Sequence, residues 1–100
     1  MIKIKFEYND KYITNVKVTG HANFKEYGKD IVCAAASSIA ITSINACLKI
    51  NKESLDVKSG DGLIDAKVNL KDETINNILL NMKDMFIELE KQYSKNVKII

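Results

Sequence analysis

The sequence has no proline and no tryptophan, four glycines and a single histidine among its 100 residues. It also lacks internal repeats and low-complexity segments, whereas 46% of its residues are hydrophobic. A disordered or fibrous chain has a different composition, because it cannot bury enough apolar surface to form a core. We therefore expect residues 1–100 to form a single domain around one hydrophobic core.

An excess of charge of one sign is missing too. Fifteen basic and thirteen acidic residues are interspersed and give a net charge of +2. Without a basic stripe, direct binding to nucleic acid is not expected. The chain has two cysteines and no recognisable secretory signal, which predicts a reducing, cytoplasmic location. One histidine and two distant thiols do not make a zinc site, and no phosphate-binding glycine loop is present, so we expect neither metal nor cofactor.

The hydrophobic pattern predicts an α+β fold, in which an antiparallel β-sheet has two helices packed on one face, in the order ββαββα(β). Alternating residues indicate strands near 2–8, 12–18, 55–57, 64–70 and 97–100, and Ser59–Gly62 is typical of a hairpin turn. An amphipathic helix should follow an N-cap at Asp72, with Asn76 on its solvated face. Residues 31–48 carry no charge and approach the length of a membrane span. Their many small and polar side chains favour a central helix packed closely on most sides, and no membrane association.

His21 and Cys33 are the residues most suggestive of chemistry. Asp30 can cap a helix that starts at Ile31, which places Cys33 in the first turn. There, backbone N–H groups and the helix dipole can stabilise a thiolate, and the same amides can hold an oxyanion. His21, at the end of the second predicted strand, could accept the thiol proton and later protonate a leaving amine.

The residues alone leave alternatives open. Cys33 can equally be one more small apolar residue of an alanine-rich helix, and a lone histidine is often structural. Asp30 could orient His21 rather than cap the helix. Ser37, one turn beyond Cys33, could bond near the site or back to a helix carbonyl. Cys47 has no expected partner, and we assign it to the core.

The string GHANFKEYGKDIVCAAAS, residues 20–37, closely resembles the signature of the ribosomal-processing cysteine protease (Prp) family. The resemblance implies a small homodimeric α+β endopeptidase. It would remove the N-terminal extension of a large-subunit ribosomal protein before ribosome assembly, cutting after a hydrophobic, aromatic-ended stretch. Carried over by motif, His21 is the general base and Cys33 the nucleophile. Gly20, Asp30 and Ser37 fall on signature positions with supporting roles.

Residues 23–29 form a polar segment that contains Gly28. We expect this segment to order over a bound peptide, although it can also be a simple surface connection. The alternative function is a ribosome-associated binding or assembly module in which the Cys–His pair performs no peptidase chemistry.

Overall fold

A computed structural model describes residues 1–20 and 31–100 of the chain, in the order ββαββαβ. The strands are β1 (Ile2–Asn9), β2 (Tyr12–Thr19), β3 (Leu55–Gly60), β4 (Leu63–Val68) and β5 (Val97–Ile99), and the helices are α1 (Ile31–Ile50) and α2 (Glu73–Gln92). These elements confirm the predicted α+β class and element order. The predicted turn at 59–62 is shorter than expected, because β3 continues to Gly60 and only Asp61 and Gly62 join the strands.

The five strands form one sheet in the order β3-β4-β2-β1-β5. The first four in this order pair antiparallel, as predicted, but β5 pairs parallel with β1, with Ile2 opposite Val97. The sheet is therefore mixed at one edge. The reason is the α2 crossover, which returns the chain to the end of the sheet where β4 began. Strand β5 must then run in the direction of β4, which is also that of β1.

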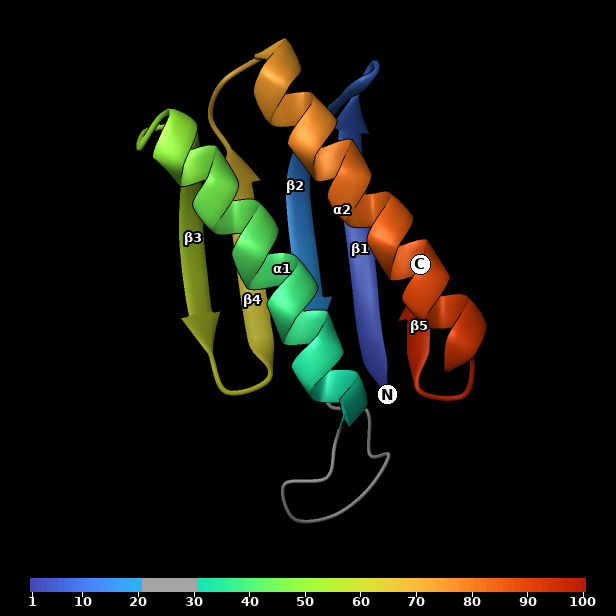
Figure 1. The fold of residues 1–100 in the computed structure, drawn as a ribbon. Coiled ribbons are helices and arrows are strands. Elements are labelled where there is room, and N and C mark those ends of the chain that lie inside the picture. Colours follow the sequence, from blue (N-terminus) through green and yellow to red (C-terminus); the bar gives the residue numbers. More distant parts are fainter. Residues whose placement is uncertain (21–30) are drawn as a thin grey trace.

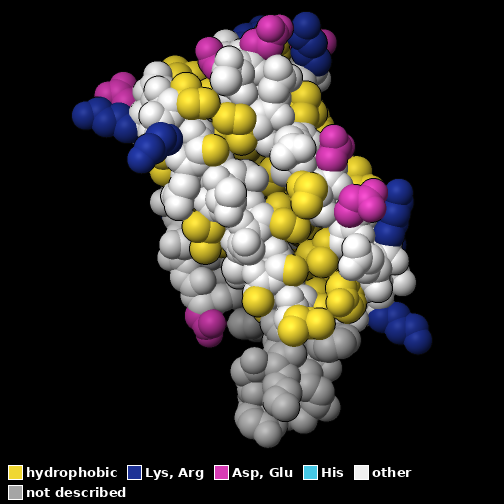
Figure 2. Space-filling view, viewed as in Figure 1, with side chains coloured by type: hydrophobic (Ala, Val, Ile, Leu, Met, Phe, Trp, Pro, Cys, Tyr) yellow, Lys and Arg dark blue, Asp and Glu magenta, His cyan; other side chains and the backbone are white. Residues whose placement is uncertain are grey.

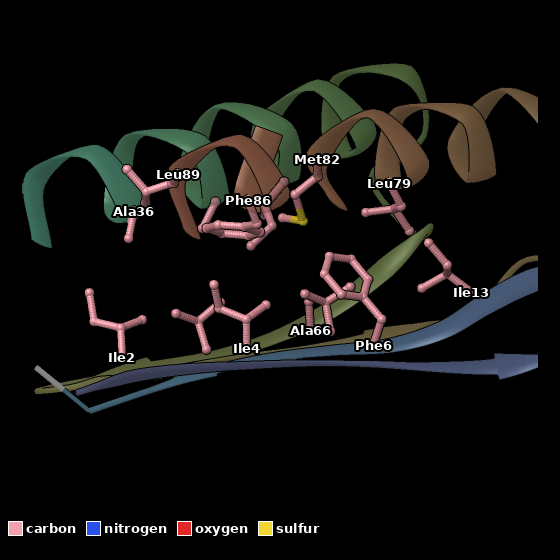
Figure 3. Packing of buried hydrophobic residues seen from close by; sticks show 14 of the residues in the cluster. Ile2, Ile4, Phe6, Ile13, Ala36, Ala66, Leu79, Met82, Phe86 and Leu89 are labelled. Atoms are coloured by element: carbon pink, nitrogen blue, oxygen red, sulfur yellow. The ribbon is translucent and has the colours of Figure 1, made fainter. Parts of the chain in front are cut away.

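Both helices cover the same face of the sheet (Figure 1). The core lies between these two layers, where Ile2, Ile4 and Phe6 of β1 point toward the helices (Figure 3). Phe6 meets Phe86 of α2 edge-to-face, with ring centroids 6.3 Å apart. This inward set of β1 was expected from its alternation, and it forms part of a core to which both helices and the other strands also contribute.

A bulge in the first hairpin changes which residues of β2 face the core. The register shifts between Glu7 and Tyr8, so that Ile13 is buried and Tyr12 and Thr14 are not, contrary to the predicted alternation. The N–H of Ile13 donates to Asn76 Oδ1 at 2.8 Å. Asn76 is consequently buried, and the prediction that it lies on the solvated face of α2 is wrong. One extra residue in a strand reverses the phase of the alternation, which a period-two pattern cannot anticipate.

The helices are equal in length and differ in how they are covered. Helix α2 begins as predicted, since Asp72 Oδ2 accepts a hydrogen bond from the Ile75 N–H at 2.9 Å. Helix α1 buries one narrow stripe against the sheet and α2, formed by Val32, Ala36, Ala40, Ile44 and Cys47. The expectation that α1 is packed on most sides is therefore wrong. The small stripe residues let α1 lie close to its neighbours, while its other faces meet solvent.

Helix α1 is also the one described helix that is long and apolar enough to cross a membrane by length and composition. Its buried stripe packs on the other elements of the domain, as in the core helix of a globular protein. The exposed side of α1 carries no charged residue between Ile31 and Leu48, and Ile41 is half exposed there.

Candidate active site

Cys33 is the third residue of α1 and lies in its first turn, as predicted. It is half-buried and lines a cavity of about 280 Å³ at one end of the sheet. The start of β1, the ends of β2 and β3, the β3–β4 turn and the first two turns of α1 enclose this cavity. A thiol in this position is accessible from the cavity but is held by the helix.

The helix start also defines the electrostatics around Cys33. Backbone N–H groups in the first turn of an α-helix have no intrahelical acceptors, and the macrodipole makes this end partially positive. Both effects favour the thiolate over the neutral thiol, which makes a cysteine nucleophilic near neutral pH. The first turn of α1 has no acidic side chain to oppose this effect.

Gly20 has a conformation and a packing environment that only glycine fits. Its φ is +89°, and a Cβ at this position would overlap the carbonyl oxygen of Met1. The Gly20 N–H donates to the carbonyl oxygen of Gly62 at 2.9 Å. The end of β2 is thus fixed against the start of β1 and the β3–β4 turn, immediately before His21 in the chain.

The other predicted site residues divide into two groups. Ser37 is exposed one turn after Cys33 and lines the same cavity, as expected from its helical spacing. His21, Gly28 and Asp30 lie outside the described residues, so the Cys–His pair, the N-cap and the segment 23–29 stay predictions.

The β3–β4 turn was missed as part of the site by the sequence analysis. Asp61, Gly62 and Leu63 line the cavity opposite Cys33, although the sequence indicated only a tight turn here. The Asp-Gly pair located the turn correctly, but a local pattern does not show which distant helix end the turn faces. That proximity follows from β4 pairing with β2, where Leu63 lies opposite Thr19.

Cys47 contrasts with Cys33 and is a core residue, as predicted. It is fully buried, and burial raises the pKa of its thiol to about 11. No disulfide joins the two cysteines. Within residues 1–20 and 31–100, no cluster of three or more His, Cys, Asp or Glu side chains could hold a metal ion. Of the two thiols, Cys33 is therefore the one that is accessible from a cavity.

The family model for "Cysteine protease Prp" matches residues 1–98. The chain belongs to this family. The ribosomal processing cysteine protease Prp of Staphylococcus aureus (strain Mu50 / ATCC 700699) is 31% identical over 103 residues, covering 99% of this chain and 97% of that protein. The Bacillus subtilis (strain 168) protein of the same name is 29% identical over 98 residues, covering 91% and 88%. Membership of the Prp family, which the string at residues 20–37 led us to expect, is thus confirmed, and the protein is a cysteine protease.

Two crystal structures of S. aureus Prp share this fold. The complex with a covalently linked product peptide superposes with a TM-score of 0.93 at 31% identity, covering 99% of this chain and 97% of that one. The complex with a substrate peptide gives a TM-score of 0.88 at 30% identity, covering 100% and 98%. Prp relatives of nearly the same length and fold therefore bind peptides.

Proposed function

We propose that this Prp protease removes the N-terminal extension of a large-subunit ribosomal protein before ribosome assembly, with Cys33 as nucleophile and His21 as general base. The position of Cys33 in the first turn of α1, at the wall of a cavity, is the observation that carries the proposal. The names of the relatives, ribosomal processing cysteine proteases, support this class of substrate.

The proposed chemistry uses two steps. His21 accepts the thiol proton, and the Cys33 Sγ attacks the carbonyl carbon of the scissile peptide bond. Backbone N–H groups at the start of α1 stabilise the oxyanion that forms. His21 then protonates the departing amine, which leaves a thioester on Cys33. Water hydrolyses this thioester and regenerates the thiol, so that no metal or cofactor takes part.

The quaternary state and location of the enzyme are proposals of the same kind. We expect a homodimer in the cytoplasm, as the family resemblance implies. The interspersed charges, with a net value of +2, support a peptide rather than nucleic acid as the ligand, and we expect no membrane association.

The test is to mix the protein with the extended ribosomal protein of the same organism and to follow both intact masses. The unmodified protein should shorten the ribosomal protein by its N-terminal extension. Cys33→Ala should leave it intact, whereas Cys47→Ala, the matched thiol deletion on the same helix, should still cleave. Binding of the ribosomal protein without any cleavage would instead support the assembly module as the function.

A further inference from the structure

The two faces of the sheet differ in their side chains. Figure 2 shows the helix side of the molecule, where the charged side chains lie mostly toward the outline of the view. The other face of the sheet points away from both helices (Figure 1), and we call it the open face. Side chains alternate along a strand, so the positions between the buried Ile2, Ile4 and Phe6 of β1 belong to the open face. Those positions hold charged residues, and the pairing of the strands determines which charges lie side by side.

On the β3–β4 side of the open face, lysines and aspartates lie opposite each other. Lys58 of β3 is paired with Asp65 of β4, and Asp56 of β3 is paired with Lys67 of β4. Cross-strand pairs of opposite charge stabilise a sheet. Asp65 also lies opposite Lys17 of β2, so this one carboxylate has a lysine on either side. We call the four residues of β3 and β4 the balanced half, because their charges cancel.

On the β1–β5 side of the open face, like charges lie opposite each other. Lys3 of β1 is paired with Lys98 of β5, and Lys5 of β1 is paired with Lys17 of β2. All four lysines are exposed. Glu7 is the one acidic residue of β1, β2 and β5, and its Oε2 lies 3.7 Å from Lys5 Nζ. Four lysines and one glutamate give this region, which we call the basic half, a net charge of +3, whereas the whole chain carries +2.

The like-charge pairs need an explanation, because lysines directly opposite each other destabilise a sheet. Lysines on an edge strand discourage pairing with another chain, and this explains Lys98, since β5 is an edge strand. It does not explain Lys5 and Lys17, since β1 and β2 are interior strands of the sheet. A bound anion offsets the repulsion between these lysines, so the arrangement favours a negatively charged partner.

The basic half lies directly behind the Cys33 cavity. Ile2 of β1 and Val18 of β2 line that cavity from the covered face of the sheet. Lys3 and Lys17 are their neighbours in the same strands and point to the opposite face. A partner on the basic half is therefore held close to the active site without occupying it, and a peptide can bind at the same time.

The positions around the lysines favour a polynucleotide over a protein as this partner. Lys3 is paired with Thr19, and Glu7 is paired with Asn15, so these positions of β1 and β2 hold polar side chains. A protein partner usually buries an apolar centre, which these positions do not offer. The phosphate backbone of a polynucleotide is bound through charge and needs no such centre. Since none of these side chains is aromatic, they also provide no platform on which a base can stack.

We propose that the basic half of the open face binds the phosphate backbone of RNA through its four lysines, without reading the bases. RNA rather than DNA is chosen because the proposed substrate is a ribosomal protein, so this choice rests on the proposed function. The catalytic ligand remains a peptide, and RNA is a second partner. The expectation of no direct binding to nucleic acid came from charges that are interspersed along the chain. Folding gathers four lysines on one surface, and the expectation does not extend to that surface.

The anisotropy of a fluorescently labelled polyuridine of about 20 nucleotides measures this binding as the full chain is added. The titration is repeated at KCl concentrations between about 50 and 200 mM, where a contact based on charge weakens steeply. Each phosphate contact on a single strand contributes about −0.7 to the slope of log K against log salt concentration. Four lysines therefore predict a slope of about −2.8.

Two double variants assign the binding to the basic half. Lys3→Gln with Lys17→Gln removes one lysine from each like-charge pair, and should weaken RNA binding at the lowest salt concentration about tenfold or more and halve the slope. Its unfolding midpoint should not fall, because the substitutions relieve repulsion. Lys58→Gln with Lys67→Gln is the matched control, since it changes the net charge equally but in the balanced half. It should retain RNA binding within about threefold.

Five results would overturn the inference. Two of them are equal weakening in the two double variants and a slope near zero. Tighter binding of polyglutamate of the same length would assign the basic half to an acidic protein, and tighter binding of phosphatidylglycerol vesicles would assign it to a lipid surface. Tighter binding of a thymidine DNA of the same length would reject RNA as the partner. Cleavage of the ribosomal protein is measured separately, without RNA. Lysine-dependent RNA binding without that cleavage would support the basic half and reject the proposed substrate, so the two failures are distinguishable.

Discussion

The two ends of α1 place the two cysteines of the chain in opposite environments. Cys33 is half-buried in the first turn, beside a cavity and near the positive end of the helix dipole. Cys47, fourteen residues later, is fully buried, and burial raises the pKa of its thiol to about 11. The residue type and the helix are the same at both positions. We therefore expect helix position and solvation, rather than residue type, to decide which of the two cysteines reacts.

The surroundings of the two cysteines differ in the same way, since Cys47 is packed in the core and Cys33 lines a cavity. Around Cys47 the contacts are those of a core helix end, where the hydroxyl of buried Ser54 donates to the Cys47 carbonyl oxygen at 3.1 Å. Around Cys33 the elements meet but leave a cavity, and the main chain of Gly20 and Gly62 forms part of its wall. Packing therefore closes the C-terminal end of α1, whereas its N-terminal end lines a cavity.

Removing the thiol at each end should produce the largest contrast. Cys33→Ser should reduce cleavage of the extended ribosomal protein by about 10³-fold or more, because a hydroxyl is a much weaker nucleophile than a thiolate near neutral pH. The midpoint of thermal unfolding should change little, since Cys33 is only partly buried. Cys47→Ala should show the reverse, with activity retained and stability reduced by about 1 kcal/mol through the small cavity left in the core. Cleavage rates and thermal melts of both variants make the comparison, and comparable activity loss in both would contradict it.

The second largest effect that we expect is a difference between the alkylation rates of the two thiols. At pH 7, a thiol with a pKa of about 11 is ionised only to about one part in 10⁴, and Cys47 is also inaccessible. Cys33 should therefore react with iodoacetamide at least about 100-fold faster than Cys47. Peptide mass spectrometry after timed alkylation measures both rates in one sample. His21→Ala should slow Cys33 and leave Cys47 unchanged, whereas equal slow labelling of both residues would mean that Cys33 is not activated.

A substitution at Gly20 changes the wall of the Cys33 cavity without replacing either cysteine. Gly20→Ala introduces a Cβ into the carbonyl oxygen of Met1 at a φ of +89°, which strains the backbone by at least about 1–2 kcal/mol. The end of β2 has to shift, and His21 follows directly. We expect about a tenfold or greater loss of kcat/KM together with a lower unfolding midpoint.

Gly60→Ala is the matched control for Gly20→Ala, since a Cβ at Gly60 meets nothing within 4 Å. It should leave the unfolding midpoint close to unchanged, and it is a control for stability alone, because Gly60 lines the Cys33 cavity. If Gly20→Ala lowered stability alone, with kcat/KM retained, Gly20 would support the fold and would not position the site.

The contrast between the two cysteines was partly predictable from sequence. The uncharged run 31–48 and the Asp30 signal placed Cys33 in a first helical turn and Cys47 deep in the helix, and both positions are confirmed for the residues that the structure describes. The pattern failed where distant elements meet. The burial of Asn76 depends on a bulge in another hairpin, and the position of the β3–β4 turn beside Cys33 depends on the pairing of β4 with β2. Such features arise from the geometry of packing, which local periodicity does not encode.

The smallest expected effect is a pH dependence of stability that belongs to Cys47 alone. A solvated cysteine in the unfolded chain has an ordinary thiol pKa of 9.0, and burial in the folded protein raises the pKa of Cys47 to about 11. Above pH 9 the unfolded chain loses this proton while the folded chain retains it, so stability falls as the pH rises toward 11. At pH 10 the loss relative to pH 8 should be about 1 kcal/mol. Urea unfolding at both values, compared with Cys47→Ala, isolates this contribution from the titrating lysines, because the variant retains all of them. Equal pH dependence in the unmodified protein and in Cys47→Ala would contradict this expectation. It would show that solvent reaches Cys47 in the folded state and lets its thiol ionise as in the unfolded chain.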